Sequence, residues 1–186
     1  MKRNHGWVLS VLLAFGLGIA PSLRAQEAAA QADKKPSAEV EAKMIETVKK
    51  LFPDAVMGEF EKIGTAGTNT VFVAPFTLRG DRMLATVISD GTLLETEEPA
   101  DIKTFPEAAN QAVRRAITQM GVKDNGVRLG RTYAEIQTDE TNNVTVVKLP
   151  EPLLTYRADV ANNHGVPGKY SFKADGTPVE KPSWSQ

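Results

Sequence analysis

The chain has 186 residues, with 22 lysines and arginines against 23 aspartates and glutamates, two histidines and no cysteine. Hydrophobic residues make up 41% and charged residues 24%, proportions that exclude collagen-like, coiled-coil and wholly disordered chains. Without cysteine the chain can form no disulfide, no Cys-ligated zinc site and no lipid anchor through a thiol.

The first 25 residues are typical of an export signal. Met1–His5 is a short basic segment, and Trp7–Ala20 is an apolar run too short to span a bilayer core of about 30 Å as a helix. We expect cleavage near Ala25, with an uncleaved anchor as the alternative. Cleavage leaves 19 of the 22 basic residues against 23 acidic ones, so the remaining chain has no basic surplus for nucleic acid.

A flexible linker is expected at residues 26–36, which lack large apolar side chains. A helical pattern follows, which Ser37 can cap and Pro53 ends. Its apolar residues recur at helical spacing and form one stripe: Val40, Met44, Ile45, Val48, Leu51 and Phe52.

After this helix the pattern changes to short apolar runs separated by turn residues. Strands are expected at residues 55–63, 70–78, 83–89 and 92–96. Pro75 predicts an edge strand or a bulge within the second of these runs. Short strands joined by tight turns indicate an antiparallel meander.

The helix-then-strands pattern occurs a second time. Thr104 and Glu107 have the spacing of a capping box, and Gly121 can end the helix. Strand-like runs follow at 127–138, 144–149, 153–160 and 169–172. The two halves also align weakly, since the Asp-Gly-Thr triplet that begins at Asp90 recurs at Asp175.

We therefore expect an α+β fold of two repeated units, each a helix packed on an antiparallel β-sheet meander. The second unit is longer, and its Pro150 and Pro152 interrupt a regular sheet. The expected divisions are a signal peptide (1–25), a flexible linker (26–36), a first unit (37–103), a second unit (104–181) and a tail (182–186).

Two stretches suggest a family. The run from Thr86 to Glu95, followed by the run from Phe105 to Val113, resembles the PepSY-type pattern: a strand that ends in Asp-Gly, a hydrophobic-Glu strand, and a helix that opens with a hydrophobic-Pro pair. The resemblance implies a tandem fold similar to that of secreted β-lactamase-inhibitor-like proteins. It also implies a non-enzymatic role in binding or restraining another extracytoplasmic protein, as in propeptides of thermolysin-type proteases. It carries over no catalytic residue.

A partner-binding surface is expected on one strand. Val71, Val73, Phe76 and Leu78 include residues on both strand faces, so one set can stay exposed after a helix covers the other. The alternative is that the second unit covers that face.

Residues suited to catalysis or metal binding are few. His164, in an Asn-Asn-His-Gly turn, is the only histidine left after export, and one imidazole without a second His or Cys is a poor metal site. Carboxylates cluster within 95–101 and 139–143, but neither stretch has the ligand spacing of an EF-hand. We therefore expect no catalytic, cofactor-binding or metal residue.

The sequence predicts a periplasmic or secreted module that binds or inhibits an extracytoplasmic protein, such as a protease or a cell-envelope protein, and is not an enzyme. It predicts no cofactor, no nucleic-acid partner and no transmembrane span after cleavage. The alternative is a protein that binds a small ligand or a divalent cation such as calcium. A remote alternative is a hydrolase built on carboxylates and His164.

Overall fold

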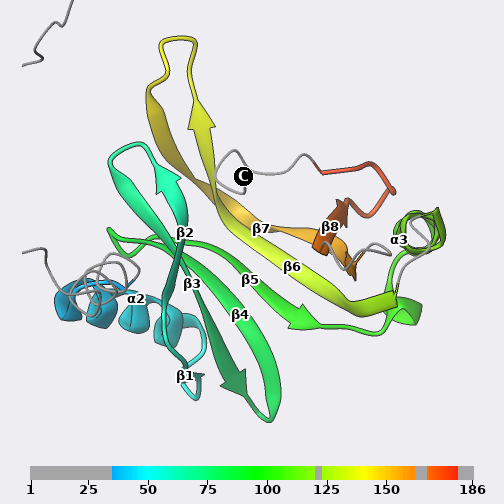
Figure 1. Ribbon diagram of the computed structural model, residues 1–186, viewed down its shortest axis with the longest axis horizontal. Coiled ribbons are helices and arrows are strands. Elements are labelled where there is room, and N and C mark those ends of the chain that lie inside the picture. Colours follow the sequence, from blue (N-terminus) through cyan, green and yellow to red (C-terminus); the bar gives the residue numbers. More distant parts are fainter. Residues whose placement is uncertain (1–34, 120–122, 162–166, 180–186) are drawn as a thin grey trace, which may run out of the picture. The chain divides into compact units, whose positions relative to one another are not determined.

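A computed structural model describes the chain at residues 35–119, 123–161 and 167–179, all within a compact unit that begins at Asp33 (Figure 1). These ranges contain two α-helices and a single antiparallel sheet of eight strands, so the fold is α+β as expected. The predicted signal peptide, most of the linker, the tail, Gly121 and His164 lie outside the described residues.

The two helices form where the sequence predicts them. Helix α2 spans Ala38–Leu51, and the hydroxyl of Ser37 accepts a hydrogen bond from the amide of Val40 at its start. Helix α3 spans Glu107–Gln119 and follows a short 3-10 helix, η1, at Ile102–Thr104. Within the described ranges no helix combines the length and the hydropathy needed to cross a membrane.

The sheet has the strand order β1-β3-β4-β5-β6-β7-β8, and β2 also pairs with β3. Because β5 pairs with β6, the strands that precede α3 and those that follow it lie in one sheet. The strand bounds are β1 Val56–Met57, β2 Glu61–Ala66, β3 Asn69–Leu78, β4 Asp81–Ile88, β5 Leu93–Pro99, β6 Lys123–Thr138, β7 Val144–Ala161 and β8 Pro167–Phe172.

The edge-strand prediction for Pro75 is wrong, and the irregularity predicted there lies in the segment that pairs beside it. Strand β3 pairs with β4 in an unbroken register and with β1 and β2 on its other side, so Pro75 is neither on an edge strand nor in a bulge of that pair. The break lies instead in the segment that runs beside β3, where residues 58–60 separate β1 from β2. In this segment the amide of Gly58 donates to the Pro75 carbonyl at 2.7 Å. The single strand expected at 55–63 is therefore two strands.

Strand β7 joins two runs that the sequence separates. Thr132 pairs with Leu153 and Ala134 with Lys148, so residues 149–152 stand opposite Tyr133 alone. Both prolines of this segment lack an N–H donor, and the irregularity places them where no ladder bond is needed. Pairing with β6 continues on either side of it.

Both helices lie on the same face of the sheet. The cross-strand pairs Ala85–Thr96, Thr96–Arg131 and Arg131–Leu154 define this face across β4 to β7, and we call it the helix face. Helix α2 packs on it over one core cluster, which includes Met44, Val48, Phe72, Phe76 and Val87. Helix α3 packs on it over another, which includes Val113, Tyr156, Ala158 and Phe172.

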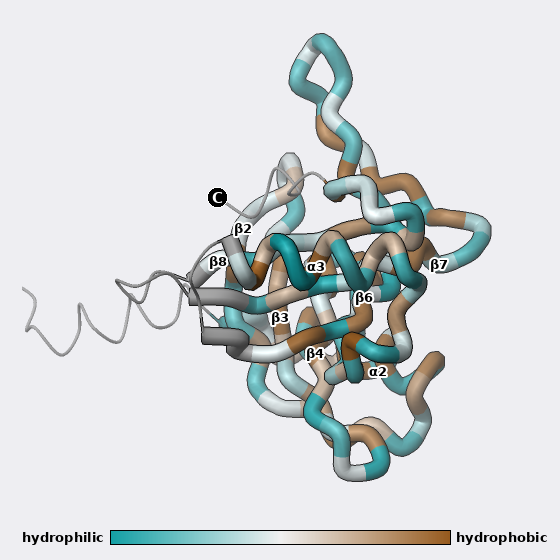
Figure 2. Tube along the Cα trace, turned by 90° about the vertical axis from the view of Figure 1, so that its right-hand side faces the viewer, coloured by the Kyte–Doolittle hydropathy of each residue, from teal (hydrophilic) through white to brown (hydrophobic). Residues whose placement is uncertain are grey.

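The opposite face, which we call the network face, is partly covered by the end of the β6–β7 hairpin. This end, residues 134–148, extends past β5, and we call it the arm. Ala134, Ile136, Val144 and Val146 of the arm form a third cluster with Ala66, Val71, Ile88 and Leu94. Figure 2 shows the arm at the top, with hydrophilic residues at its tip and hydrophobic residues nearer the sheet.

Candidate functional site

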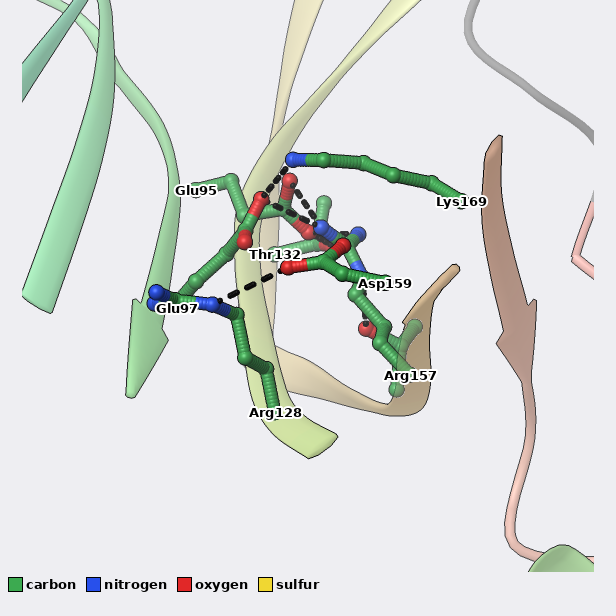
Figure 3. A network of polar contacts seen from close by, with 8 residues as sticks. Glu95, Glu97, Arg128, Thr132, Arg157, Asp159 and Lys169 are labelled. Atoms are coloured by element: carbon green, nitrogen blue, oxygen red, sulfur yellow. Dashed lines mark hydrogen bonds and ion pairs between the residues drawn. The ribbon is translucent and has the colours of Figure 1, made fainter. Parts of the chain in front are cut away.

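A group of charged side chains with a buried centre lies on the network face, and we call it the charge network. It joins four consecutive strands: Glu95 and Glu97 from β5, Arg128 and Thr132 from β6, Thr155, Arg157 and Asp159 from β7, and Lys169 from β8 (Figure 3). Alternate residues of a strand point to the same face, so the i, i+2 spacing of these residues brings them together.

Arg157 is the centre of the charge network. Its Nη1 donates to Glu95 Oε2 and to Glu97 Oε1, both at 2.9 Å, and its Nη2 also contacts Glu95 Oε1. Its Nε donates to the hydroxyl of Thr155 at 3.1 Å. One guanidinium thus binds two carboxylates, and the side chains of Arg157, Glu95 and Glu97 are only 10%, 8% and 6% exposed.

Gly130 makes this reach possible. It lies on β6 between Glu97 on one side and Thr155 on the other, so Arg157 must cross it to arrive at β5. A Cβ at Gly130 would lie 3.0 Å from Arg157 Nε and closer still to the Thr155 hydroxyl. Strand interiors disfavour glycine, and a close approach of another group is one reason to keep one there.

The remaining members balance the charge. Lys169 Nζ donates to Glu97 Oε1 at 3.0 Å, and Arg128 Nε donates to Asp159 Oδ2 at 3.2 Å. Three acidic and three basic side chains therefore face one another across the four strands. Glu97 Oε2 is buried and makes no hydrogen bond to the described residues, so the desolvation of this carboxylate is incompletely offset.

Burial raises the pKa of Glu95 above its ordinary value, and the nearby negative charge of Glu97 acts in the same direction. The positive charge of Arg157 and the hydrogen bonds from Arg157 and Thr132 oppose this rise in pKa. Desolvation is the largest effect, which is typical of two carboxylates that share one cation in a site with little solvent.

The charge network can clamp strands together but lacks the parts of a catalytic site. Each carboxylate already binds a cation through at least one oxygen, and the network contains no Ser-His or Cys-His pair. Among the described residues no group of three or more His, Cys, Asp or Glu side chains is arranged to hold a metal ion.

The structure keeps Glu95 and Glu97 together on Arg157 but separates the other carboxylates that cluster in sequence. Glu98 lies on the helix face and binds Arg131 at 2.5 Å, while Asp101 accepts the amide of Lys103 at the start of η1. In the second stretch, Asp139 binds its own turn: its carboxylate accepts from the amides of Thr141 and Asn143, both at 2.8 Å. Among the described residues, neither stretch places three or more carboxylates around one point.

The predicted partner-binding residues fall on both faces. Phe76 and Leu78 lie on the helix face, in or against the cluster beneath α2, and Phe76 is 1% exposed. Val71 lies on the network face but is fully buried beneath the arm, so at this residue the second half of the chain does cover the face. Val73 lies on the network face and is half-buried.

Sequence reasoning missed Gly130, Arg157 and Lys169. The run Tyr156-Arg157-Ala158-Asp159 carried a signal, because its apolar and charged residues alternate as they do in a strand with one apolar face. The pairing of β5 with β6 and of β7 with β8, which brings Glu97 near Lys169, has no local signature in the sequence.

No known family profile matches the sequence, and no curated protein matches it. Solved structures do resemble it. A proposed periplasmic protein from Bacteroides eggerthii matches with a TM-score of 0.50 and 15% identity, over 78% of this chain and 86% of its own. At this identity the likeness establishes the fold and nothing about activity.

Two other structures match with TM-scores below 0.5. One is a BLIP-like protein from Bacteroides fragilis, with a TM-score of 0.47 and 16% identity over 81% of this chain and 89% of its own. The other is a DUF2874 family protein from Bacteroides uniformis, with a TM-score of 0.48 and 14% identity over 75% of this chain and 86% of its own.

Proposed function

We propose that this chain is a non-catalytic, extracytoplasmic module that binds a protein partner through the network face of its sheet and thereby inhibits or restrains it. One observation carries the proposal: both helices pack on the helix face, and within the described residues the one hydrophobic cluster on the network face lies beneath the arm. A sheet with one face free of helices offers a broad surface for recognition.

The contact surface that we propose is centred on Val73. Pro75 pairs with Leu84 beside it, and all three residues are half-buried on the network face. They border Glu97, which pairs with Leu84, so the apolar residues lie next to the charge network. Of the four residues that the sequence indicated, Val73 is the one we retain as a direct contact; Val71 lies beneath the arm.

The absence of a reactive arrangement in the charge network favours binding over catalysis. Its carboxylates and cations neutralise one another, so they rigidify the sheet rather than activate a substrate. Recognition then depends on shape and on apolar contact, as in other protein interfaces.

Export and a two-unit organisation complete the proposal. The pattern of residues 1–25 supports a cleaved signal that sends the chain to the periplasm or outside the cell, followed by a linker at 26–36. We also propose that residues 37–103 and 104–181 are related PepSY-like units with a short tail at 182–186. The separate core cluster beneath each helix supports this division.

The test is capture of partners from a periplasmic extract by the chain from Gln26 onward. Val73→Lys and Leu84→Lys should each reduce capture of a specific protein at least tenfold, because each places a charge on the proposed contact surface. Leu154→Lys is the matched control, since Leu154 is 39% exposed on the helix face. Equal capture by all three variants would reject the network face as the binding surface.

A further inference from the structure

The arm is attached to the sheet by few backbone contacts. Strand β5 pairs with β6 only from Pro99–Arg128 to Glu95–Thr132, and the arm begins after this point. From Ala134 to Lys148 the ladder pairs in the described structure join the two arm strands to each other. Side-chain packing therefore holds the arm against the rest of the sheet.

The base of the arm has the geometry of a hinge. Residues 149–152 bulge out of β7 opposite Tyr133, and Pro150 and Pro152 are both exposed and lack N–H donors. Tyr133 itself packs against the core cluster beneath α2 and anchors the other side of the junction. A ladder interrupted on one strand is a place where a hairpin can bend.

The tip of the arm beyond this hinge is closed by its own hydrogen bonds. At its tip the Asp139 carboxylate accepts hydrogen bonds from the amides of Thr141 and Asn143 and from the side chains of the same two residues. The tip thus satisfies its own polar groups and draws no hydrogen bond from β2 to β5 in doing so. Motion at the hinge would move the arm as one body.

The surface beneath the arm is apolar and owes its burial to the arm. Val71 and Ile88 form a cross-strand pair with no exposed surface, and Leu94 beside them is 2% exposed. The arm residues that contact them, Ile136, Val144 and Val146, are only half-buried. Val71 is two residues from Val73 on the same face, so this patch continues into the proposed contact surface.

We propose that the arm is a hinged cover over the patch formed by Val71, Ile88 and Leu94, and that an apolar β-segment of the partner binds the patch in place of the arm. The occupant is an extended or hairpin segment with branched apolar side chains at alternate positions, because the inner side of the arm already has this chemistry. The inference rests on the proposed function, whose contact surface it extends.

Cysteine labelling tests whether the cover opens, because the chain has no thiol of its own. Ile88→Cys places a thiol beneath the arm, and Val87→Cys places one on the helix face; both side chains are fully buried. After correction for the stability of each variant, iodoacetamide should modify Ile88→Cys at least tenfold faster. Equal rates would overturn the hinge. Should either variant fail to fold, Val71→Cys and Ala74→Cys form a second pair with the same contrast.

A disulfide tests docking. The Cβ of a residue at Gly67 would lie 3.1 Å from Val144 Cβ, so a shift of about half an ångström brings Gly67→Cys and Val144→Cys into disulfide range and locks the arm when oxidised. The positive φ of Gly67 strains the reduced and the oxidised variant alike, so their comparison cancels it. The probe is a synthetic peptide of residues 134–148. It should bind the reduced variant at least tenfold more tightly than the oxidised one, and a peptide with serine at positions 136 and 146 should not bind. Equal binding in both redox states would overturn docking.

The two proposals can fail separately. Fast labelling of Ile88→Cys together with no partner captured by the chain would reject the proposed function and keep the hinged arm. Slow labelling together with capture that depends on Val73 would reject the hinged arm and keep the network face as the binding surface.

Discussion

The side chain of Arg157 crosses Gly130 on the neighbouring strand. Its Nε and Cζ lie 3.0 and 3.1 Å from the position that a Cβ at Gly130 would occupy. This close approach lets a guanidinium on β7 reach two carboxylates on β5, with β6 between them. Gly130 is needed here for space, since its φ lies outside the left-handed region that favours glycine.

Gly130→Ala should destabilise the fold by about 3 kcal/mol, because the added methyl group clashes with the Thr155 hydroxyl and displaces Arg157 from its buried carboxylates. Urea denaturation of the variant and the wild type measures the difference. Gly80→Asn is the control: nothing lies within 4 Å of a Cβ there, and asparagine tolerates a positive φ better than other residues. A loss at Gly130 no larger than that at Gly80 would contradict the packing argument.

Arg157→Met should cost about 3–5 kcal/mol near pH 7, because Glu95 and Glu97 then lie buried beside each other without a shared cation. The cost should shrink as the pH falls towards about 5, since a carboxylate in this setting takes up a proton instead. Denaturation curves at several pH values measure both effects.

Arg131→Met is the matched control on the helix face. Arg131 and Glu98 also form an ion pair, but their side chains are 33% and 30% exposed, so its loss should cost less than about 1 kcal/mol at any of these pH values. Similar costs for both variants would mean that the burial of the charge network has little energetic consequence.

The local elements of the fold could be predicted from the sequence. Helix α2 follows its apolar stripe from Val40 to Phe52, and the β3–β4 hairpin follows its turn at Arg79-Gly80, where both residues have positive φ. The edge-strand prediction for Pro75 failed because proline avoids interior strands only where its missing N–H would leave a ladder bond unmade. Here the adjacent edge is interrupted opposite Pro75, so the strand remains interior.

The candidate site could not be predicted, because it depends on which strands become neighbours. Glu97 and Lys169 are 72 residues apart and meet only because β5 to β8 are consecutive in the sheet. The arm shows the same limit: Pro150 and Pro152 mark the irregularity opposite Tyr133, but nothing local in the sequence shows that Val144 and Val146 beyond it cover the cluster of Val71.

Asp139→Asn should lower stability above about pH 4 and make little difference in strong acid. Hydrogen bonds from Thr141 and Asn143 lower the pKa of Asp139 from 3.8 to about 2, so the folded chain holds this proton less tightly than the unfolded chain. The stabilisation is therefore fully present above about pH 4 and is lost as the pH falls from about 4 to 2. Two-dimensional NMR of the arm amides follows the titration of Asp139, and an Asp139 carboxyl that titrates near 3.8 would contradict the tip geometry.

Glu95 should have the opposite effect on stability. Because burial raises its pKa, the folded chain holds this proton more tightly than the unfolded chain, and stability falls as the pH rises from about 4.5 through the pKa of the folded state. Glu95→Gln cannot titrate, so its stability relative to the wild type should become worse as the pH is lowered across that range. Denaturation of both proteins from about pH 4.5 to 8 measures this difference. Stability curves that run parallel over the whole range would mean that Arg157 and Thr132 cancel the desolvation of Glu95, and the strands would then be clamped without any coupling to protons.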